Sequence, residues 1–208
     1  NPSIKSDPTN YLSSLRTFDK INPLRVYIGG DSLASTFGSE LATSLAATGK
    51  VIPSWDSRPS SGLINENFFN WNQHAEAIST KYKPELTFFI IGTNDASIVK
   101  LDPTGYAASY KEKLSEIARI FSANGEPLYF VLAPNMQEKT LNENLLKLNT
   151  VIQEFANENS YETINSAAIL SPGNVFVPSL NNVSVRTDDG VHITNAGGKL
   201  ISEFIMTK

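Results

Sequence analysis

The chain has 208 residues, 40% of them hydrophobic, which suits one domain of ordinary size with a substantial buried core. Lys and Arg total 17 against 21 Asp and Glu, so the chain lacks the excess of positive charge that binds a phosphate backbone. Nucleic acid is therefore not an expected partner. Cysteine is absent, which excludes disulfides, thiolate catalysis and Cys-based metal sites.

The first twenty residues are predicted to be a linker or N-terminal extension. Residues 1–10 are rich in Asn, Pro, Ser and Thr, and the chain lacks an initiator Met. We expect a domain from a longer secretory or membrane-anchored protein, with the folded, catalytic part spanning residues 21–208. Its longest apolar runs, such as residues 86–92, are far shorter than the ~20 residues that span a bilayer, so we expect a soluble domain.

Strand and helix patterns alternate along the folded part. Short β-rich or apolar runs predict strands at residues 25–29, 50–55, 86–91, 128–132 and 161–165. Apolar residues at helical spacing predict helices from residue 33 onward and over residues 70–81, 103–122, 138–159 and 196–206. Residues 56–63 and 171–187 are predicted loops, because the first is rich in Ser, Pro and Gly and the second lacks periodicity.

This alternation predicts an α/β fold. Strands separated by helices of ten or more residues imply βαβ crossovers, hence a parallel sheet of about five strands inside a three-layer α/β/α sandwich of the flavodoxin-like kind. Ligands in such folds bind outside the carboxyl ends of the strands. Ser32, Asn94 and the loop after Leu132 all follow predicted strands, so they are expected at one edge of the sheet.

Three short blocks carry the candidate chemistry: residues 30–33 (Gly-Asp-Ser-Leu), 92–95 (Gly-Thr-Asn-Asp) and 189–192 (Asp-Gly-Val-His). Ser32 follows a strand and precedes a helix, as a nucleophile on a sharp turn does. His192 is the candidate base, because imidazole is the side chain that ordinarily titrates near neutral pH. Asp189 can orient the imidazole. Together they indicate acyl transfer through a serine ester.

Each of these residues has an alternative interpretation. Ser32 could be the N-cap of the following helix, and Asn94 could belong to an ordinary turn. Asp188 competes with Asp189, which the three-residue spacing to His192 favours. His74, the second histidine, lies in a polar helical segment and is predicted to be a surface residue.

The blocks and their order resemble the SGNH hydrolases, also called GDSL-type esterases, over nearly the whole domain. In this resemblance residues 60–63 (Ser-Ser-Gly-Leu) match the second block, and the oxyanion donors are the N–H groups of Ser32 and Gly62 and the side-chain amide of Asn94. Gly62 has an alternative as an ordinary loop glycine. Residues 68–71 (Phe-Phe-Asn-Trp) and 189–194 further resemble an uncharacterised bacterial subgroup, whose relatives occur in cell-envelope proteins or fused to membrane acyltransferases. The resemblance therefore implies an extracytoplasmic location.

Four other residues are candidate substrate contacts. Trp55, Arg58 and Arg186 lie on loops expected near the site. Asp31 is a further candidate, although its position in the turn suits a side chain that bonds local backbone N–H groups. We expect neither a metal nor another cofactor, because two distant histidines offer no ligand spacing.

The leading functional hypothesis is hydrolysis of a small ester, with an O-acetyl group on cell-envelope carbohydrate as the substrate that the resemblance implies. The same serine could instead pass an acyl group to a sugar hydroxyl, as a transferase or as the partner of a membrane acyltransferase. A third hypothesis, from another class, is a non-catalytic carbohydrate-binding domain. Water or alcohol as acceptor separates the first two, and no residue reveals which.

Overall fold

A computed structural model describes residues 15–207, so most of the predicted linker lies outside the described residues. Five strands of this part form one sheet, in the order β2-β1-β3-β4-β5, and every adjacent pair is parallel. Their bounds are β1 Leu24–Gly30, β2 Val51–Trp55, β3 Leu86–Ile90, β4 Leu128–Leu132 and β5 Glu162–Asn165. The predicted parallel α/β fold is confirmed.

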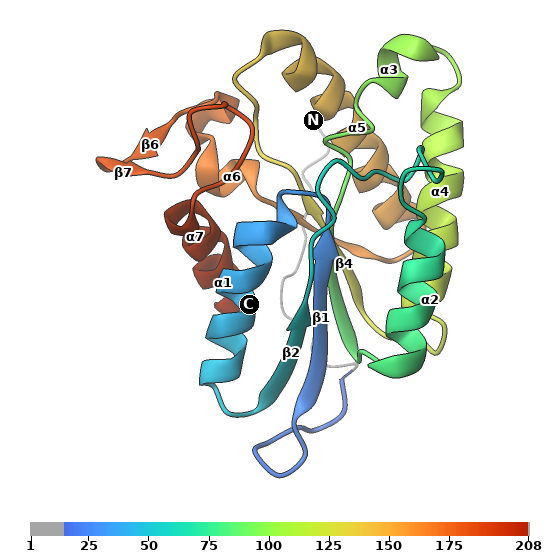
Figure 1. Cartoon of the computed structure of the whole chain (residues 1–208), viewed down its shortest axis with the longest axis vertical. Helices are drawn as coiled ribbons and strands as arrows, with labels where there is room; N and C mark the ends of the chain where they lie inside the picture. The colour runs from blue at the N-terminus through green and yellow to red at the C-terminus, as the bar shows by residue number, and fades with distance from the viewer. Residues whose placement is uncertain (1–14, 208) are drawn as a thin grey trace.

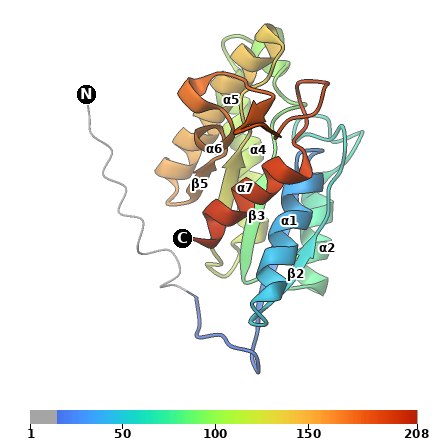
Figure 2. The same cartoon turned by 90° about the vertical axis from the view of Figure 1, so that its left-hand side faces the viewer.

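Helices cover both faces of the sheet (Figures 1 and 2). The longer ones are α1 Ala34–Ala47, α2 Trp71–Lys81, α4 Tyr106–Phe121, α5 Lys139–Glu158 and α7 Asn195–Met206. Phe37 of α1 and Ile201 of α7 pack with Ile90 of β3 in one buried cluster. Phe89, the preceding residue of β3, packs with Tyr110 of α4 in the other cluster, because successive side chains of a strand point to opposite faces.

The described end of the predicted linker packs against this domain. Leu15 and Phe18 contact the core cluster of α1 and α7. The Arg16 guanidinium donates to both carboxylate oxygens of Glu85, at 2.5 and 3.0 Å. The packed domain therefore begins before residue 21.

Short elements were not predicted. These are α3 Ile98–Leu101, α6 Ala167–Leu170, a 3-10 turn Pro172–Asn174, and a hairpin of β6 Ser179–Leu180 and β7 Val183–Ser184. The hairpin turns through Asn181 and Asn182, both at positive φ, which Asn tolerates better than most residues. Elements of two to four residues are too short to show a periodicity, so their segments resemble loops. No helix within residues 15–207 combines the length and apolar character that crossing a membrane requires.

The turn that ends β1 leaves no room for a side chain at its first position. Gly30 has φ +151°, and a Cβ there would collide with the carbonyl oxygen of Ile90 on the neighbouring strand β3. The N–H of Asp31 donates to that same carbonyl at 3.1 Å. The close approach of β1 and β3 at this point therefore requires glycine.

Asp31 then ties this turn to the loop after β3. Its carboxylate accepts the N–H of Leu33 at 2.9 Å and the N–H of Thr93 at 3.3 Å, and the side chain is fully buried. Burial raises the pKa of Asp31 to about 7, although the two backbone hydrogen bonds oppose that rise. The carboxyl group binds a proton more tightly in the folded chain than in the unfolded one.

Gly30→Ala is expected to lower the free energy of unfolding by about 3 kcal/mol or more, because the collision with Ile90 adds to the strain of the positive φ. The matched control is Gly125→Ala, at φ +86° with open space around it, which carries strain alone and costs about 1–2 kcal/mol. Urea unfolding measures both. Equal losses in the two variants would contradict the steric argument.

Asp31→Asn is expected to change how stability depends on pH. Between about pH 4 and pH 7 the folded wild type retains a proton that the unfolded chain has released, so its unfolding free energy falls as the pH rises. Asn cannot ionise, so the stability of the variant relative to wild type should rise by on the order of 3 kcal/mol from pH 4 to pH 8. Urea unfolding across this range checks it, and parallel curves for the two proteins would refute it.

Candidate active site

Ser32 lies between the Gly30–Asp31 turn and the first residue of α1. The helix has Leu33 at its N-cap, without a side-chain cap hydrogen bond. The Ser32 hydroxyl instead lies 2.9 Å from Nε2 of His192. This contact favours the nucleophile over the capping interpretation, because the hydroxyl is hydrogen-bonded to a base.

His192 and Asp189 come from the loop that precedes α7. Nδ1 of His192 lies 2.7 Å from Oδ2 of Asp189. The other oxygen, Oδ1, accepts the Thr187 hydroxyl at 2.7 Å and the N–H groups of Val191 and His192 at 2.8 and 2.9 Å. The loop thus folds around the carboxylate and aims it at the ring. Asp188 is exposed, and the structure brings Asp189 to the imidazole.

These hydrogen bonds determine the charge of Asp189. Desolvation raises the pKa of its carboxyl, but the hydrogen bonds from the His192 ring, the His192 N–H, Thr187 and Val191 outweigh it and hold the pKa well below the ordinary range. An ionised Asp189 fixes the imidazole tautomer with Nε2 free to take a proton from Ser32. The side chains of His192 and Asp189 are 43% and 50% exposed, so this pair is open to solvent.

The three predicted oxyanion donors lie on loops that hydrogen-bond to one another. The side-chain amide of Asn94 donates to the carbonyl of Ser61 at 2.8 Å, next to Gly62. That contact uses one of the two amide N–H bonds of Asn94. Within residues 15–207, the backbone N–H groups of Ser32 and Gly62 have no acceptor. Donors that have no other acceptor are what a developing oxyanion needs.

Two of the predicted substrate contacts are wrong. Asp31 is fully buried and already accepts two backbone N–H groups, so it holds the turn. Arg186 is 1% exposed. Its guanidinium donates to the carbonyls of Asn135, Val191 and His192 and stacks on the Phe176 ring at 5.0 Å. Arg186 therefore supports the loop that carries the histidine.

Burial also lowers the pKa of Arg186. Desolvation lowers its pKa to about 10, and the nearby Asp189 opposes the change. The guanidinium thus stays protonated at neutral pH and keeps all its donors for the loop carbonyls. An arginine in a predicted loop is expected to be exposed, and nothing in the sequence of residues 171–187 indicates that Arg186 is buried.

Trp55 is the last residue of β2, and Arg58 lies on the loop that follows, next to the Gly30–Asp31 turn. Trp55 is 43% exposed. The Arg58 N–H donates to the carbonyl of Gly30 at 2.9 Å, and its guanidinium pairs with Asp56 at 3.3 Å and covers the Phe69 ring. Both side chains are partly exposed.

The prediction that His74 is a surface residue is wrong. Its side chain is 18% exposed, with Nε2 2.7 Å from Oδ2 of Asp56, and it packs against the rings of Phe69 and Trp71. Tyr27 donates to the other oxygen of Asp56 at 2.7 Å. The polar neighbours of His74 in the sequence face outward while the ring faces inward. The imidazole that contacts Ser32 is His192.

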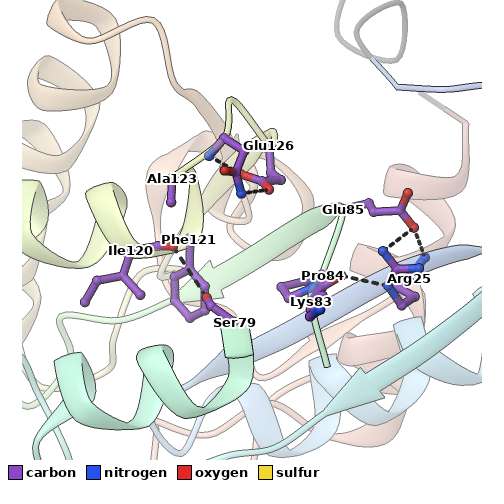
Figure 3. A pocket seen from close by; sticks show the side chains of 10 residues that line it. Arg25, Ser79, Lys83, Pro84, Glu85, Ile120, Phe121, Ala123 and Glu126 are labelled. Carbon is purple, nitrogen blue, oxygen red and sulfur yellow. Dashed lines mark hydrogen bonds and ion pairs between the residues drawn. The ribbon is translucent and has the colours of Figure 1, made fainter. Parts of the chain in front are cut away.

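A cavity of about 390 Å³ lies at the end of the sheet opposite to Ser32, where the strands begin. It is lined by residues at the amino ends of β1 and β3 and at the ends of α2 and α4 (Figure 3). Arg25 pairs there with Glu85 at 3.3 Å and donates to the carbonyl of Lys83, while Glu126 accepts from Asn124. It is remote from Ser32, which follows the carboxyl end of β1. Within residues 15–207, no three His, Asp or Glu side chains are grouped to hold a metal ion.

Two side chains near Asn94 hold the Gly62 loop, and the sequence analysis assigned no role to either. Asp95 follows Asn94, and its carboxylate accepts N–H groups of the loop after Gly62. The Tyr110 hydroxyl donates to the same carboxylate at 3.0 Å. The position of Asp95 in the block of residues 92–95 was a signal. Tyr110 had none, because it occupies an apolar position of a helix.

Comparisons with known proteins agree with this architecture. Solved structures with the same fold include a GDSL-like lipase from Bacteroides thetaiotaomicron (17% identity, 88% of this chain and 86% of that one, TM-score 0.64). A putative lipolytic protein of the GDSL family from Desulfitobacterium hafniense matches with 14% identity over 88% and 98% of the two chains, at a TM-score of 0.69. An acetylxylan esterase from Geobacillus stearothermophilus matches with 12% identity over 88% and 93%, at a TM-score of 0.63.

Among curated proteins, no relative matches the chain. The family model that matches is described as a protein of unknown function, DUF459, and it covers residues 25–208. That range begins within β1 and includes Ser32, Gly62, Asn94, Asp189 and His192. The chain belongs to the DUF459 family and has the fold of the SGNH, or GDSL-type, hydrolases.

Proposed function

We propose that this protein is a serine esterase that removes small O-acyl groups, acetyl in the first place, from carbohydrate. The observation that carries the proposal is the continuous line of contacts from Asp189 through His192 to the Ser32 hydroxyl, at 2.7 and 2.9 Å. A serine, an oriented imidazole and an ionised carboxylate are the groups that covalent acyl transfer needs.

The reaction follows from the positions of these groups. His192 takes the proton of Ser32 as Oγ bonds to the ester carbonyl carbon. The resulting oxyanion accepts hydrogen bonds from the N–H groups of Ser32 and Gly62 and from the Asn94 amide. The bond to the alcohol oxygen then breaks, and His192 gives that oxygen its proton. Water repeats the sequence on the acyl serine, which releases the carboxylic acid and restores the hydroxyl.

A carbohydrate ester is favoured because the site is open. With His192 and Asp189 both near half exposed, a bulky alcohol such as a polysaccharide can reach Ser32 without a lid moving. One structural neighbour is an acetylxylan esterase, an enzyme for this kind of substrate. Trp55 and Arg58 are the proposed contacts to the sugar, since both remain accessible beside the turn.

The cellular setting is part of the same proposal. The resemblance of residues 68–71 and 189–194 to envelope-associated SGNH domains supports an extracytoplasmic location and an acylated envelope glycan as substrate. Attachment to a membrane, or to a membrane acyltransferase, in the full-length protein is the arrangement that the same relatives suggest. Hydrolysis and transfer share every step up to the acyl serine, so the choice of acceptor must be measured.

Ser32→Ala is expected to lower kcat/KM for p-nitrophenyl acetate and for an acetylated glycan by about 10³-fold or more, because the nucleophile is lost. Ser35→Ala is the matched control: this residue lies three positions later, in the first turn of α1, and its hydroxyl contacts Ser57 at 2.8 Å, so activity should stay within about twofold of wild type. Turnover at the uncatalysed background rate in both wild type and Ser32→Ala would eliminate the serine mechanism and leave only a binding role.

The same assay with a sugar acceptor present separates hydrolysis from transfer. Free acetate from the wild type, unchanged by the acceptor, is the expected result. An acetyl group found on the added sugar would replace the esterase by an acyltransferase that uses the same Ser32.

Asp189→Asn is expected to lower kcat by about 10²–10⁴-fold, because an amide facing Nδ1 favours the wrong imidazole tautomer. Asp188→Asn, one residue earlier and exposed, should change kcat by less than about twofold. Steady-state kinetics on both variants decides between the two carboxylates. The opposite ranking would transfer the role to Asp188.

A further inference from the structure

Asp95 connects the Asn94 turn to the loop that carries Gly62. Its side chain is almost completely buried. Oδ2 accepts the N–H of Leu63 at 2.9 Å, and Oδ1 accepts the N–H of Ile64 at 3.1 Å. The two residues after Gly62 are therefore both held by one carboxylate, which lies directly after the oxyanion residue Asn94 in the chain.

The carboxylate of Asp95 also lies directly against Gly62 itself. A Cβ at position 62 would collide with Oδ1 of Asp95, so the absence of a side chain at this position is needed for this packing. On the other side of Gly62, Asn94 donates to the carbonyl of Ser61 at 2.8 Å. Consecutive side chains, 94 and 95, thus hold the backbone immediately before and after the Gly62 amide.

Tyr110 supplies the third hydrogen bond to this carboxylate. It belongs to α4, on the face of the sheet that α1 does not cover, and its hydroxyl donates to Oδ2 of Asp95 at 3.0 Å from a fully buried side chain. Burial raises the pKa of Asp95, while the N–H groups of Leu63 and Ile64 and the Tyr110 hydroxyl oppose that rise. All three donors compensate the carboxylate for its lost hydration and fix its plane.

We propose that Asp95, oriented by Tyr110, is a positioning residue that sets the Gly62 N–H as an oxyanion donor. The inference rests on the proposed esterase function, in which that N–H stabilises the tetrahedral intermediate. A carboxylate suits the task because both of its oxygens accept, so it binds two successive amides at once. Asparagine accepts through one oxygen only, and its NH₂ group would face an N–H or a hydroxyl.

The test compares Asp95→Asn and Tyr110→Phe with Asp102→Asn. Asp102 also accepts a backbone N–H, that of Gly105 at 2.9 Å, in a turn beyond α3, so its variant makes the same chemical change away from the loop. Turnover is measured per active site, with active sites counted by titration with an organophosphate. Hydrogen exchange of the amides of residues 62–64 gives a second readout that needs no substrate.

Asp95→Asn is expected to lower kcat by about 10–100-fold and to leave KM within about threefold, because an oxyanion donor acts in the transition state. Tyr110→Phe should shift kcat in the same direction by a smaller factor, about 3–10-fold. Amide exchange at residues 62–64 should accelerate in both, and Asp102→Asn should match wild type.

The outcomes separate this inference from the proposed function. A wild type that hydrolyses no ester would defeat the proposed function, and exchange at residues 62–64 would still report whether Asp95 holds the loop. An active wild type together with an unchanged kcat per active site in Asp95→Asn would overturn the positioning role, even if the variant melts earlier. If Asp95→Asn does not fold, Tyr110→Phe, which removes a single hydroxyl, decides the question.

Discussion

The site depends on the packing of the first helix against the last. Ser32 and His192 are 160 positions apart in the chain, yet their side chains lie 2.9 Å from each other. Phe37 and Ile201 share one buried cluster between α1 and α7, and polar contacts add direction: Thr36 donates to the carbonyl of Ile193 at 2.9 Å, and the hydroxyls of Ser44 and Ser202 meet at 2.9 Å. Because Ile193 follows the histidine directly, this packing determines where the imidazole lies.

Buried polar side chains perform the corresponding task among the loops. Asp31 joins the nucleophile turn to the loop after β3, Asp95 joins that loop to the Gly62 segment, and Arg186 gathers the carbonyls of the histidine loop. A buried charge is costly unless it is fully hydrogen-bonded, so each of these side chains is stable only when its loops are in place. Order in these loops therefore depends on the protonation state of Asp31 and on the folding of the domain as a whole.

The predictable part of the molecule is the part with a periodic pattern. Residues 128–132 were predicted to be a strand and are β4, and the helix predicted over residues 138–159 is α5 within one residue at each end. Ser32, Asp189 and His192, which the structure brings into contact, and Asn94 each belong to a short block with a recognisable spacing. The hairpin around Asn181 and the burial of Arg186 and His74 could not be found. They depend on contacts between distant segments, which leave no local pattern.

The proposed mechanism requires His192 to activate the Ser32 hydroxyl for attack on an acyl carbon. Reaction with a p-nitrophenyl phosphonate, followed by peptide mapping in a mass spectrometer, tests this step, because an activated serine displaces the nitrophenolate much faster than an ordinary hydroxyl does. We expect one phosphonyl group per chain, on Ser32, and none in His192→Ala. A label on another residue, or stoichiometric labelling that persists in His192→Ala, would contradict it.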